Sequence, residues 1–301
     1  MINQMDKKYL NWINKNINKN EFKNKNIFIT GGNSGIGLAL AKYCAYLEAN
    51  VFLLCRSKIK AESAIKEILE SFPYSKVEFL PLDLASLNSI KECAELIKKY
   101  DVDMFINNAG VYHLPKSKTA DGFEITMGTN FLGTYYLNNL LIPYFQNLGH
   151  TIKVCFVSSL TSKYAHIDVN DLFMDKKYNK MKIYSRSKQA MNCVYYHYVE
   201  KNIKDIYFVL SHPGVAYTPL IKKGYKNNLF QSTAKCFMRL VFHSPEKAAL
   251  SPLYGLALNK TCTIGPKHLF GAVGYPHKWK IKKYKKMTQV IEKADELLYK
   301  K

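Results

Sequence analysis

The stretch NIFITGGNSGIG occupies residues 26–37 and joins a short apolar run to a glycine-rich turn and then to a helical pattern. Glycines here let the backbone turn tightly and approach a pyrophosphate, and the helix that follows offers free N–H groups and the positive end of its dipole. A glycine cluster also marks ordinary turns, but its place between the first strand and the first helix favours a dinucleotide-binding loop. We therefore expect a cofactor to be bound by Gly31, Asn33, Ser34, Gly35, Ile36 and Gly37.

Short apolar runs alternate with longer amphipathic runs over most of the chain. The apolar runs predict strands at residues 26–30, 51–55, 77–80, 103–107, 152–158 and 206–211. The amphipathic runs predict helices from the glycine turn to about Leu47 and over 58–71, 87–100, 122–146 and 182–201. Such strands, apolar on both faces and separated by helices, are typical of a parallel sheet covered on both sides. We expect an α/β fold: a doubly wound parallel sheet of the Rossmann type in a single three-layer α/β/α domain, with ligands beyond the carboxyl ends of the strands.

The domain is expected to span residues 26–275, with helical extensions at 1–25 and 276–301. In the first extension, apolar residues recur at helical spacing from Ile2 to Ile17, which predicts an amphipathic helix packed on the domain. The second extension holds nine lysines against three acidic residues, and we expect a packed helix there as well. The lysines of both extensions leave a weak peripheral contact with a membrane open as an alternative.

Composition narrows the location of the protein. No apolar run of about 18 residues predicts a membrane-spanning helix, and the N-terminus lacks the apolar core of a signal peptide. The seven cysteines are scattered without a CxxC pair, which argues against a disulfide framework or a structural metal site and favours a reducing compartment. We expect a cytoplasmic protein in which most cysteines are small buried hydrophobic residues.

The formal net charge of +21 raises the question of a nucleic-acid partner. The only arginines are Arg56, Arg186 and Arg239, whereas surfaces that bind phosphates and bases favour the rigid fork of arginine. No nucleic-acid recognition motif is present, so we expect no such partner. The positive field instead favours capture of an anionic cofactor.

The second predicted strand ends in Cys55-Arg56-Ser57, about 20 residues beyond the glycine turn, where an adenosine ribose should lie. An acidic residue at this point would bind a free 2′-hydroxyl, whereas an arginine favours a 2′-phosphate. Arg56 stands there without an acidic neighbour, although a solvated surface arginine is the alternative. The sequence therefore favours NADP(H) over NAD(H).

Tyr184 and Lys188 lie four residues apart on a predicted helix, so their side chains share one face. A free tyrosine has a pKa of about 10 and transfers protons poorly at neutral pH. An ammonium group one turn away, together with a cationic nicotinamide, is expected to lower the pKa of the phenol. Ser159 follows the predicted strand at 152–158 and is placed to bind a substrate oxygen. A YxxxK pair is common by chance, so its weight comes from its order after the glycine loop, the NNAG stretch at 107–110 and the strand-end serine.

These motifs together resemble the short-chain dehydrogenase/reductase family over about residues 26–257: TGGNSGIG (30–37), NNAG (107–110), Ser159, YSRSK (184–188) and Pro213-Gly214. The stretches SKTADGFEITMGTNFLGTYYLNNLLIP (117–143) and CRSKIKAE (55–62), with the gap between Ser159 and Tyr184, are similar to the retinol-dehydrogenase-like branch. That branch generally prefers NADP(H), in agreement with the interpretation of Arg56.

The resemblance implies a role for each matching position. Asn130 would hold a water in the proton relay, and Ser159, in preference to Ser158, would orient the carbonyl. Tyr184 would donate or accept the proton, and Lys188 would bind the nicotinamide ribose and tune Tyr184. Asp83 and Leu84 would contact the adenine, and the adenosine side would be contacted by Asn107, Asn108, Ala109 and Gly110. The nicotinamide carboxamide would be packed and bonded by Pro213, Gly214, Val215 and Thr218.

The resemblance thus predicts an NADP(H)-dependent oxidoreductase that interconverts a carbonyl and an alcohol, either as a monomer or as a homodimer. Residues 215–244, which follow Gly214, are rich in apolar side chains and favour a hydrophobic substrate such as a retinoid-, steroid- or lipid-like aldehyde or ketone. The alternative is a catalytically silent protein that senses NADP(H) on the same fold, but such proteins usually lose the tyrosine or the lysine.

Overall fold

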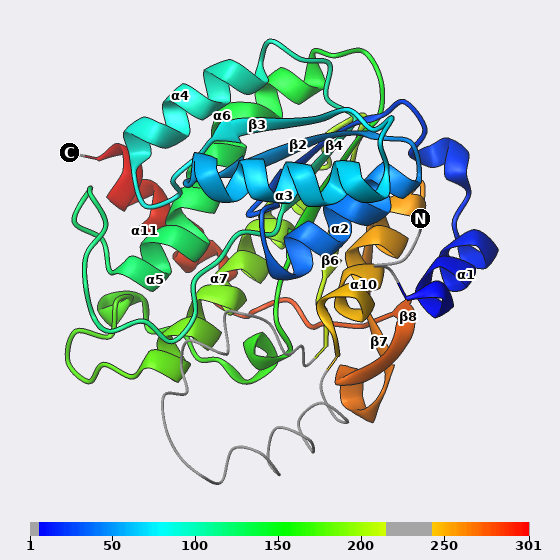
Figure 1. The fold of residues 1–301 in the computed structure, drawn as a ribbon. Coiled ribbons are helices and arrows are strands. Elements are labelled where there is room, and N and C mark those ends of the chain that lie inside the picture. The colour runs from blue at the N-terminus through cyan, green and yellow to red at the C-terminus, as the bar shows by residue number, and fades with distance from the viewer. Residues whose placement is uncertain (1–5, 215–242, 301) are drawn as a thin grey trace, which may run out of the picture.

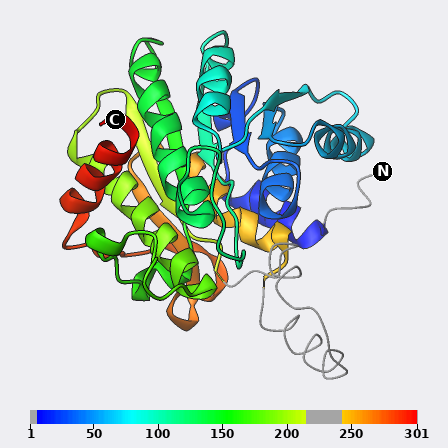
Figure 2. The same ribbon diagram turned by 90° about the vertical axis from the view of Figure 1, so that its left-hand side faces the viewer.

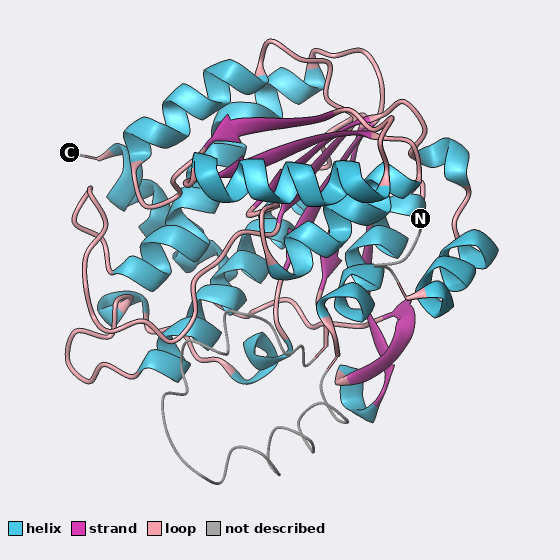
Figure 3. Ribbon diagram, viewed as in Figure 1, coloured by secondary structure: helices cyan, strands magenta, loops and turns pink. Residues whose placement is uncertain are grey.

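The computed structural model describes residues 6–214 and 243–300, and an eight-stranded sheet forms its centre (Figure 3). The spatial order of the strands is β3-β2-β1-β4-β5-β6-β7-β8, and only β8 runs antiparallel to its neighbour. The chain therefore builds outward in one direction from β1 to β3 and then in the other from β4, which is the doubly wound arrangement. The strands are β1 Asn26–Thr30, β2 Asn50–Cys55, β3 Val77–Pro81, β4 Met104–Asn107, β5 Ile152–Val157, β6 Ile206–Ser211, β7 Cys262–His268 and β8 Val273–Lys278.

The fold class expected from the sequence is confirmed, but β7 and β8 were not predicted. Their sequences, CTIGPKH and VGYPHK, contain the glycines and prolines that weaken a strand pattern. Strand β8 is the edge strand, where proline is tolerated because one row of backbone groups has no further strand to pair with. Strand β7 lies between β6 and β8, and its Pro266 stands opposite Pro276, next to a shift in the register of the two strands. The hairpin that they form is closed by a short 3₁₀ turn, Leu269–Gly271.

Helices cover both faces of the sheet, so the domain has three layers (Figures 1 and 2). Successive residues of a strand point to opposite faces of the sheet and pack into two separate hydrophobic cores. Phe28 belongs to one core, and Ile27 and Ile29 belong to the other. The first core is covered by α4 Leu87–Ile97, α6 Gly133–Gln146, α7 Lys180–Glu200 and α11 Met287–Tyr299. The second is covered by α2 Gly35–Tyr46, α3 Lys58–Ser71, α10 Pro245–Ala257 and α1 Lys7–Asn16.

The single helix predicted over 122–146 is interrupted in the structure. A short α5, Ile125–Met127, is followed by a π-helical turn at Gly128–Leu132 before α6 begins at Gly133. The buried carboxylate of Glu124 starts this segment by accepting hydrogen bonds from the backbone N–H groups of Thr126 (3.0 Å) and Met127 (2.8 Å). All residues of Gly128–Leu132 are buried, so the sequence there has no polar side whose spacing would reveal the π-turn, although such turns are frequent at functional sites.

Both terminal extensions pack on the domain. Helix α1 buries Tyr9, Leu10 and Ile13, as its amphipathic pattern predicts, and Trp12 stacks on Tyr275 of β8 with ring centroids 5.5 Å apart. Helix α11 buries Met287, Val290, Ile291 and Ala294. Strand β8 runs across residue 276, where the C-terminal extension was expected to begin. Among the described residues, no helix has the length and hydropathy needed to cross a membrane.

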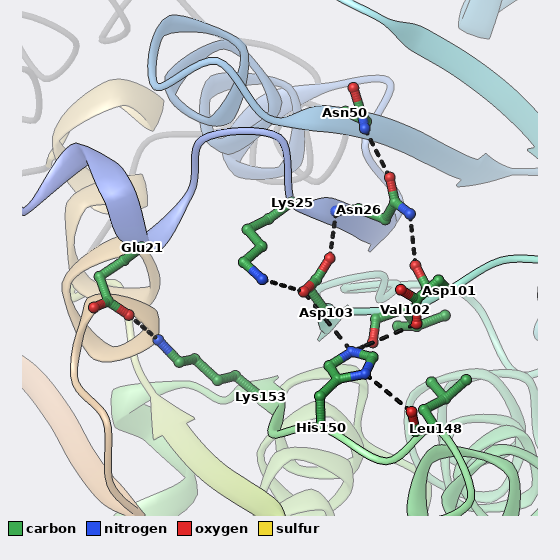
Figure 4. A network of polar contacts seen from close by, with 10 residues as sticks. All are labelled: Glu21, Lys25, Asn26, Asn50, Asp101, Val102, Asp103, Leu148, His150 and Lys153. Carbon is green, nitrogen blue, oxygen red and sulfur yellow. Dashed lines mark hydrogen bonds and ion pairs between the residues drawn. The ribbon is translucent and has the colours of Figure 1, made fainter.

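A polar network ties together the amino ends of the strands, at the edge opposite the expected site (Figure 4). Lys153 of β5 is 7% exposed and donates to Glu21 at 2.8 Å, and Lys25 donates to Asp103 at 2.8 Å. Burial alone would raise the pKa of Glu21, but hydrogen bonds from Lys153 and Asn259 outweigh it and lower that pKa. The network therefore contributes to stability at neutral pH and lies away from the carboxyl ends of the strands.

The described cysteines are all free and buried, as expected for small hydrophobic residues: Cys44, Cys55, Cys93, Cys155, Cys193 and Cys262. Cys236 lies outside the described residues.

Candidate active site

The glycine-rich loop connects β1 to α2 at the carboxyl end of the sheet. Gly31 and Gly35 have positive φ angles of 65° and 56°, which only glycine adopts without strain. A Cβ added to Gly37 would lie 2.2 Å from the carbonyl oxygen of Gly31, so the first turn of α2 packs directly on the loop backbone. Ser34 is the N-cap of α2, but its hydroxyl makes no capping bond to the helix. This close backbone approach at a helix N-terminus fits a pyrophosphate.

Asn108 braces the glycine loop from the neighbouring strand end. Its Nδ2 donates to the carbonyl oxygen of Thr30 at 2.9 Å, and the backbone N–H groups of Asn108 and Ala109 donate to the Thr30 hydroxyl at 3.0 and 2.9 Å. Thr30 was not singled out from the sequence, although it stands beside the first glycine. The side chain of Asn108 therefore holds the loop in shape instead of extending freely toward a ligand.

Asn107 points into the core and not along the sheet edge. It is 2% exposed, and it exchanges side-chain hydrogen bonds of 3.2 and 2.8 Å with Asn138 of α6. Asn107 was expected to contact the adenosine side of the cofactor, and Asn138 was not singled out from the sequence. The only signal available for Asn138 was an asparagine in an otherwise apolar helix.

Residues expected around the adenosine lie after β2 and β3. Arg56 is 66% exposed, and its guanidinium lies 4.0 Å from the carboxylate of Asp83, a loose contact that leaves the arginine free to bind an anion. Asp83 also accepts from the backbone N–H of Ala85 at 2.9 Å, which shapes the turn after β3. The side chain of Leu84 is buried in the hydrophobic core, so its expected adenine contact is limited to its backbone.

Tyr184 lies in the first half of α7 and faces the loops that follow β4 and β5. Ser159 directly follows Ser158 at the end of β5, and its hydroxyl lies near enough to the phenol to lower the pKa of Tyr184. The same hydroxyl exchanges a hydrogen bond of 3.1 Å with the hydroxyl of Thr161. Tyr112 packs edge-on against Tyr184, with ring centroids 4.8 Å apart. Ser158, the less favoured alternative, is 3% exposed and donates to Oδ1 of Asn192 at 2.6 Å. Of the two serines, Ser159 is the one whose hydroxyl acts on the phenol.

Lys188 and Asn130 meet around Gly110. The Lys188 ammonium donates to the carbonyl oxygen of Val157 at 2.8 Å. A Cβ added to Gly110 would lie 3.2 Å from Oδ1 of Asn130 and 3.5 Å from Nζ of Lys188, so these polar atoms converge on the glycine backbone. Asn130, in the π-turn, is held by Val111, whose N–H donates to Oδ1 at 2.7 Å and whose carbonyl accepts from Nδ2 at 2.9 Å. The structure therefore brings together all four residues of the expected tetrad at the carboxyl ends of β4 and β5.

The pKa values differ from the sequence-based expectation. Burial raises the pKa of Tyr184 to about 12; the hydrogen bond with Ser159 lowers it, and the nearby phenol of Tyr112 raises it. Burial lowers the pKa of Lys188 to about 8. Lys188 is not among the groups that shift the pKa of Tyr184 in the protein alone, and its ammonium is directed to the carbonyl of Val157. The expected lowering, which also requires a cationic nicotinamide, stays a prediction.

The loop after β6 completes this edge of the sheet. Gly214 has a positive φ of 77°, and its N–H donates to Nδ1 of His212 at 3.2 Å. The carbonyl of Pro213 accepts from Nδ1 of His243 at 3.1 Å. Neither histidine was singled out from the sequence. The expected contacts of Val215 and Thr218, and nearly all of the apolar segment 215–244, lie outside the described residues.

Comparison with known proteins agrees with this geometry. The family model for short chain dehydrogenases matches residues 25–228. Human polyprenol dehydrogenase is 32% identical over 260 residues, which cover 80% of this chain and 75% of that protein. Human retinol dehydrogenase 13 is 35% identical over 255 residues, 82% of this chain and 76% of that protein.

Solved structures show the same fold. An uncharacterised protein from Mycobacterium Paratuberculosis superposes with a TM-score of 0.73 at 26% identity, covering 92% of this chain and 94% of its own. An actinorhodin polyketide ketoreductase, solved with NADPH, superposes with a TM-score of 0.61 at 20% identity, covering 80% of this chain and 92% of its own.

The chain belongs to the short-chain dehydrogenase/reductase family, whose members are oxidoreductases that act on alcohol and carbonyl groups with a nicotinamide cofactor. Within the family it falls in the retinol-dehydrogenase-like branch, the group formed by these curated relatives.

Proposed function

We propose that this protein is an NADP(H)-dependent oxidoreductase that interconverts a hydrophobic alcohol and its carbonyl, with Tyr184 as the general acid and base. The observation that carries the proposal is the meeting of Tyr184, Ser159, Lys188 and Asn130 at the strand ends beside the glycine loop. A buried lysine or an accidental YxxxK pair alone would not bring a strand-end serine and the π-turn asparagine to the same place.

The residues divide the chemistry between them. The nicotinamide supplies or accepts the hydride. In reduction, Tyr184 gives its phenolic proton to the substrate oxygen, and a pKa of about 12 keeps that proton in place at neutral pH. Ser159, whose hydroxyl lies beside the phenol, holds the same oxygen. In oxidation the phenol must lose its proton, which requires positive charge near it; the Lys188 ammonium, one turn away on α7, is the group of this chain placed to provide it.

The test is Tyr184→Phe, which removes the phenolic oxygen and keeps the ring. We expect turnover to fall by at least about 10³-fold, while the affinity for NADPH changes little, because general acid–base catalysis contributes about 10²–10⁴-fold. Tyr112→Phe is the matched control, since it removes a neighbouring phenol and leaves Tyr184 intact. Retained turnover in the Tyr184 variant would remove Tyr184 from the proposed role.

Arg56 supports the preference for NADP(H). Its exposed guanidinium follows β2, and its contact with Asp83 is loose, so a 2′-phosphate meets a cation that is not already neutralised. We expect Arg56→Ser to weaken NADPH binding by about tenfold or more and to change NADH binding little. Fluorescence titration with both nucleotides measures this, and tighter binding of NADH by the wild-type protein would contradict the proposal.

The relatives are named as polyprenol and retinol dehydrogenases, which supports a hydrophobic substrate for this chain as well. Apolar groups near Tyr184 agree with this: Met181 is 43% exposed one turn before it, and its sulfur lies 2.8 Å from the Tyr112 hydroxyl. A panel that compares long-chain and polycyclic alcohols with short polar ones tests the substrate class. Faster oxidation of the polar alcohols would contradict it.

We also propose a cytoplasmic location with at most weak contact to an anionic membrane. The segment from the last residue of β8 to the start of α11 supports this contact, because it carries six exposed lysines: Lys278, Lys280, Lys282, Lys283, Lys285 and Lys286. Flotation with vesicles of phosphatidylcholine, with and without phosphatidylserine, tests it at low and high salt. Equal recovery with both vesicle types would dismiss the contact.

A further inference from the structure

Two buried histidines border the loop after β6. His212 directly follows β6 and is fully buried, and His243 precedes α10 and is 4% exposed. Neither belongs to the tetrad. Their four ring nitrogens nevertheless lie around one short segment, Pro213-Gly214, and the β7–β8 hairpin beside it.

His212 shapes the segment from within. Its Nδ1 accepts a hydrogen bond from the N–H of Gly214 at 3.2 Å, two residues ahead, so the chain turns tightly around Pro213. Because Nδ1 accepts, the ring proton is on Nε2, and this buried atom has no hydrogen-bond partner among the described residues. The ring packs against Trp279, with centroids 4.1 Å apart. A Cβ on Gly265 would lie 2.1 Å from Nε2, so the ring has no room to turn away.

His243 joins the same segment to the hairpin from the other side. Its Nδ1 donates to the carbonyl oxygen of Pro213 at 3.1 Å, and its Nε2 accepts from the backbone N–H of Gly274 in β8 at 3.1 Å. Only the neutral ring with its proton on Nδ1 makes both bonds. Burial lowers the pKa of His243 to about 4, with Lys247 lowering it further and the bond to Pro213 opposing the change. The ring is therefore neutral, as the geometry requires.

Gly214 shows how little freedom the segment has. It adopts a φ of 77°, and a Cβ at this position would lie 2.5 Å from the carbonyl oxygen of Ala272 and 3.2 Å from Nδ1 of His243. The turn is thus seated on the hairpin, and its polar backbone atoms are taken up by the two histidines.

We infer that His212 and His243 are positioning residues that clamp the Pro213-Gly214 turn onto the β7–β8 hairpin and so set the surface against which the nicotinamide ring packs. This inference rests on the proposed function, because it assigns the clamp to the nicotinamide end of the cofactor. It predicts that the clamp controls binding of the nicotinamide half and leaves the adenosine half unaffected.

Two substitutions of His243 each remove one of its two hydrogen bonds and keep the other. An asparagine places its amide near Nδ1 and keeps a donor for Pro213, whereas a glutamine places its amide near Nε2 and keeps only the partner of Gly274. The probes are NADPH and 2′-phospho-ADP-ribose, which lacks the nicotinamide. Tyr195→Phe is the control for a general loss of stability, because it removes a buried hydrogen bond of 3.3 Å to the carbonyl of Cys262 in β7.

The clamp needs both bonds of His243, so His243→Gln and His243→Asn should each weaken NADPH binding by about tenfold, the size of one lost hydrogen bond, and change binding of 2′-phospho-ADP-ribose by less than about twofold. Tyr195→Phe should bind NADPH within about twofold of the wild type. Equal weakening of both probes by either His243 variant, or NADPH binding by either variant that matches the wild type, would overturn the clamp while the proposed function stands. Failure of the wild-type protein to bind either probe would instead remove the proposed function and the clamp's role with it.

Discussion

Replacing Lys188 with methionine should abolish turnover and yet stabilise the nucleotide-free protein at neutral pH. Lys188 is 4% exposed, and burial lowers its pKa from 10.5 to about 8, so the native state holds the ammonium at a cost in free energy. The difference in pKa corresponds to about 3 kcal/mol. The methionine variant also loses the hydrogen bond to the Val157 carbonyl, which offsets about 1 kcal/mol of the stability gained by removing the buried charge. Methionine has a similar length and no charge, so the net gain in stability at pH 7 is about 2 kcal/mol.

The difference in stability between the variant and the wild type is expected to depend on pH. Because the pKa of Lys188 is lower in the folded protein, the unfolded chain binds more protons between about pH 8 and 10.5, and the lysine-dependent part of the stability rises through this window. The methionine variant has no such group. The stability advantage of the variant should therefore be largest below pH 8 and shrink as the pH approaches 10.5.

Urea unfolding of both proteins from pH 6 to about 10.5, followed by circular dichroism, measures the difference directly. Comparing the two proteins cancels the buried tyrosines and cysteines that titrate in the same range. Lys91→Met removes the same charge from an exposed position of α4 and serves as the control. A variant at Lys188 that is less stable than the wild type at pH 7, or a difference that does not change with pH, would refute the reasoning.

Two further predictions concern packing and charge. Gly37→Ala places a Cβ 2.2 Å from the carbonyl oxygen of Gly31, so it should lower the free energy of unfolding by about 1–3 kcal/mol and weaken NADPH binding at least about tenfold. The control is Gly255→Ala, whose Cβ would lie 2.5 Å from a side chain of β6. It should lower the melting temperature without changing the affinity for NADPH. Glu21→Gln leaves the Lys153 ammonium unpaired, and since Glu21 is 25% exposed we expect a loss of about 2 kcal/mol at pH 7. The pKa of Glu21 is lowered in the folded state, so its contribution to stability is present above the unfolded pKa and is lost as the pH falls through the folded pKa. A loss in the Glu21 variant that does not shrink as the pH is lowered in urea titrations would contradict this account.

Residues near one another in the chain were predicted well. Gly31 and Gly35 follow a strand and open a helix, and the structure gives both the positive φ angles that the loop requires. Tyr184 and Lys188 share a face of α7 because a helix repeats every 3.6 residues. An error arose where every residue of a segment is buried and no polar side marks the helical period, as in the π-turn that holds Asn130.

The sequence by itself thus determined the order of the first six strands and of the main helices between them, and the set of residues able to form the tetrad, because periodicity and turn chemistry act between neighbours in the chain. Only the tertiary structure decided that Asn107 pairs with Asn138, that Asn108 supports the glycine loop, and that a histidine 30 residues away holds the Pro213 carbonyl. It also decided that burial raises the pKa of Tyr184 and lowers that of Lys188. Desolvation and contacts between distant segments depend on which surfaces meet in the folded chain, and they leave no periodic trace in the order of its residues.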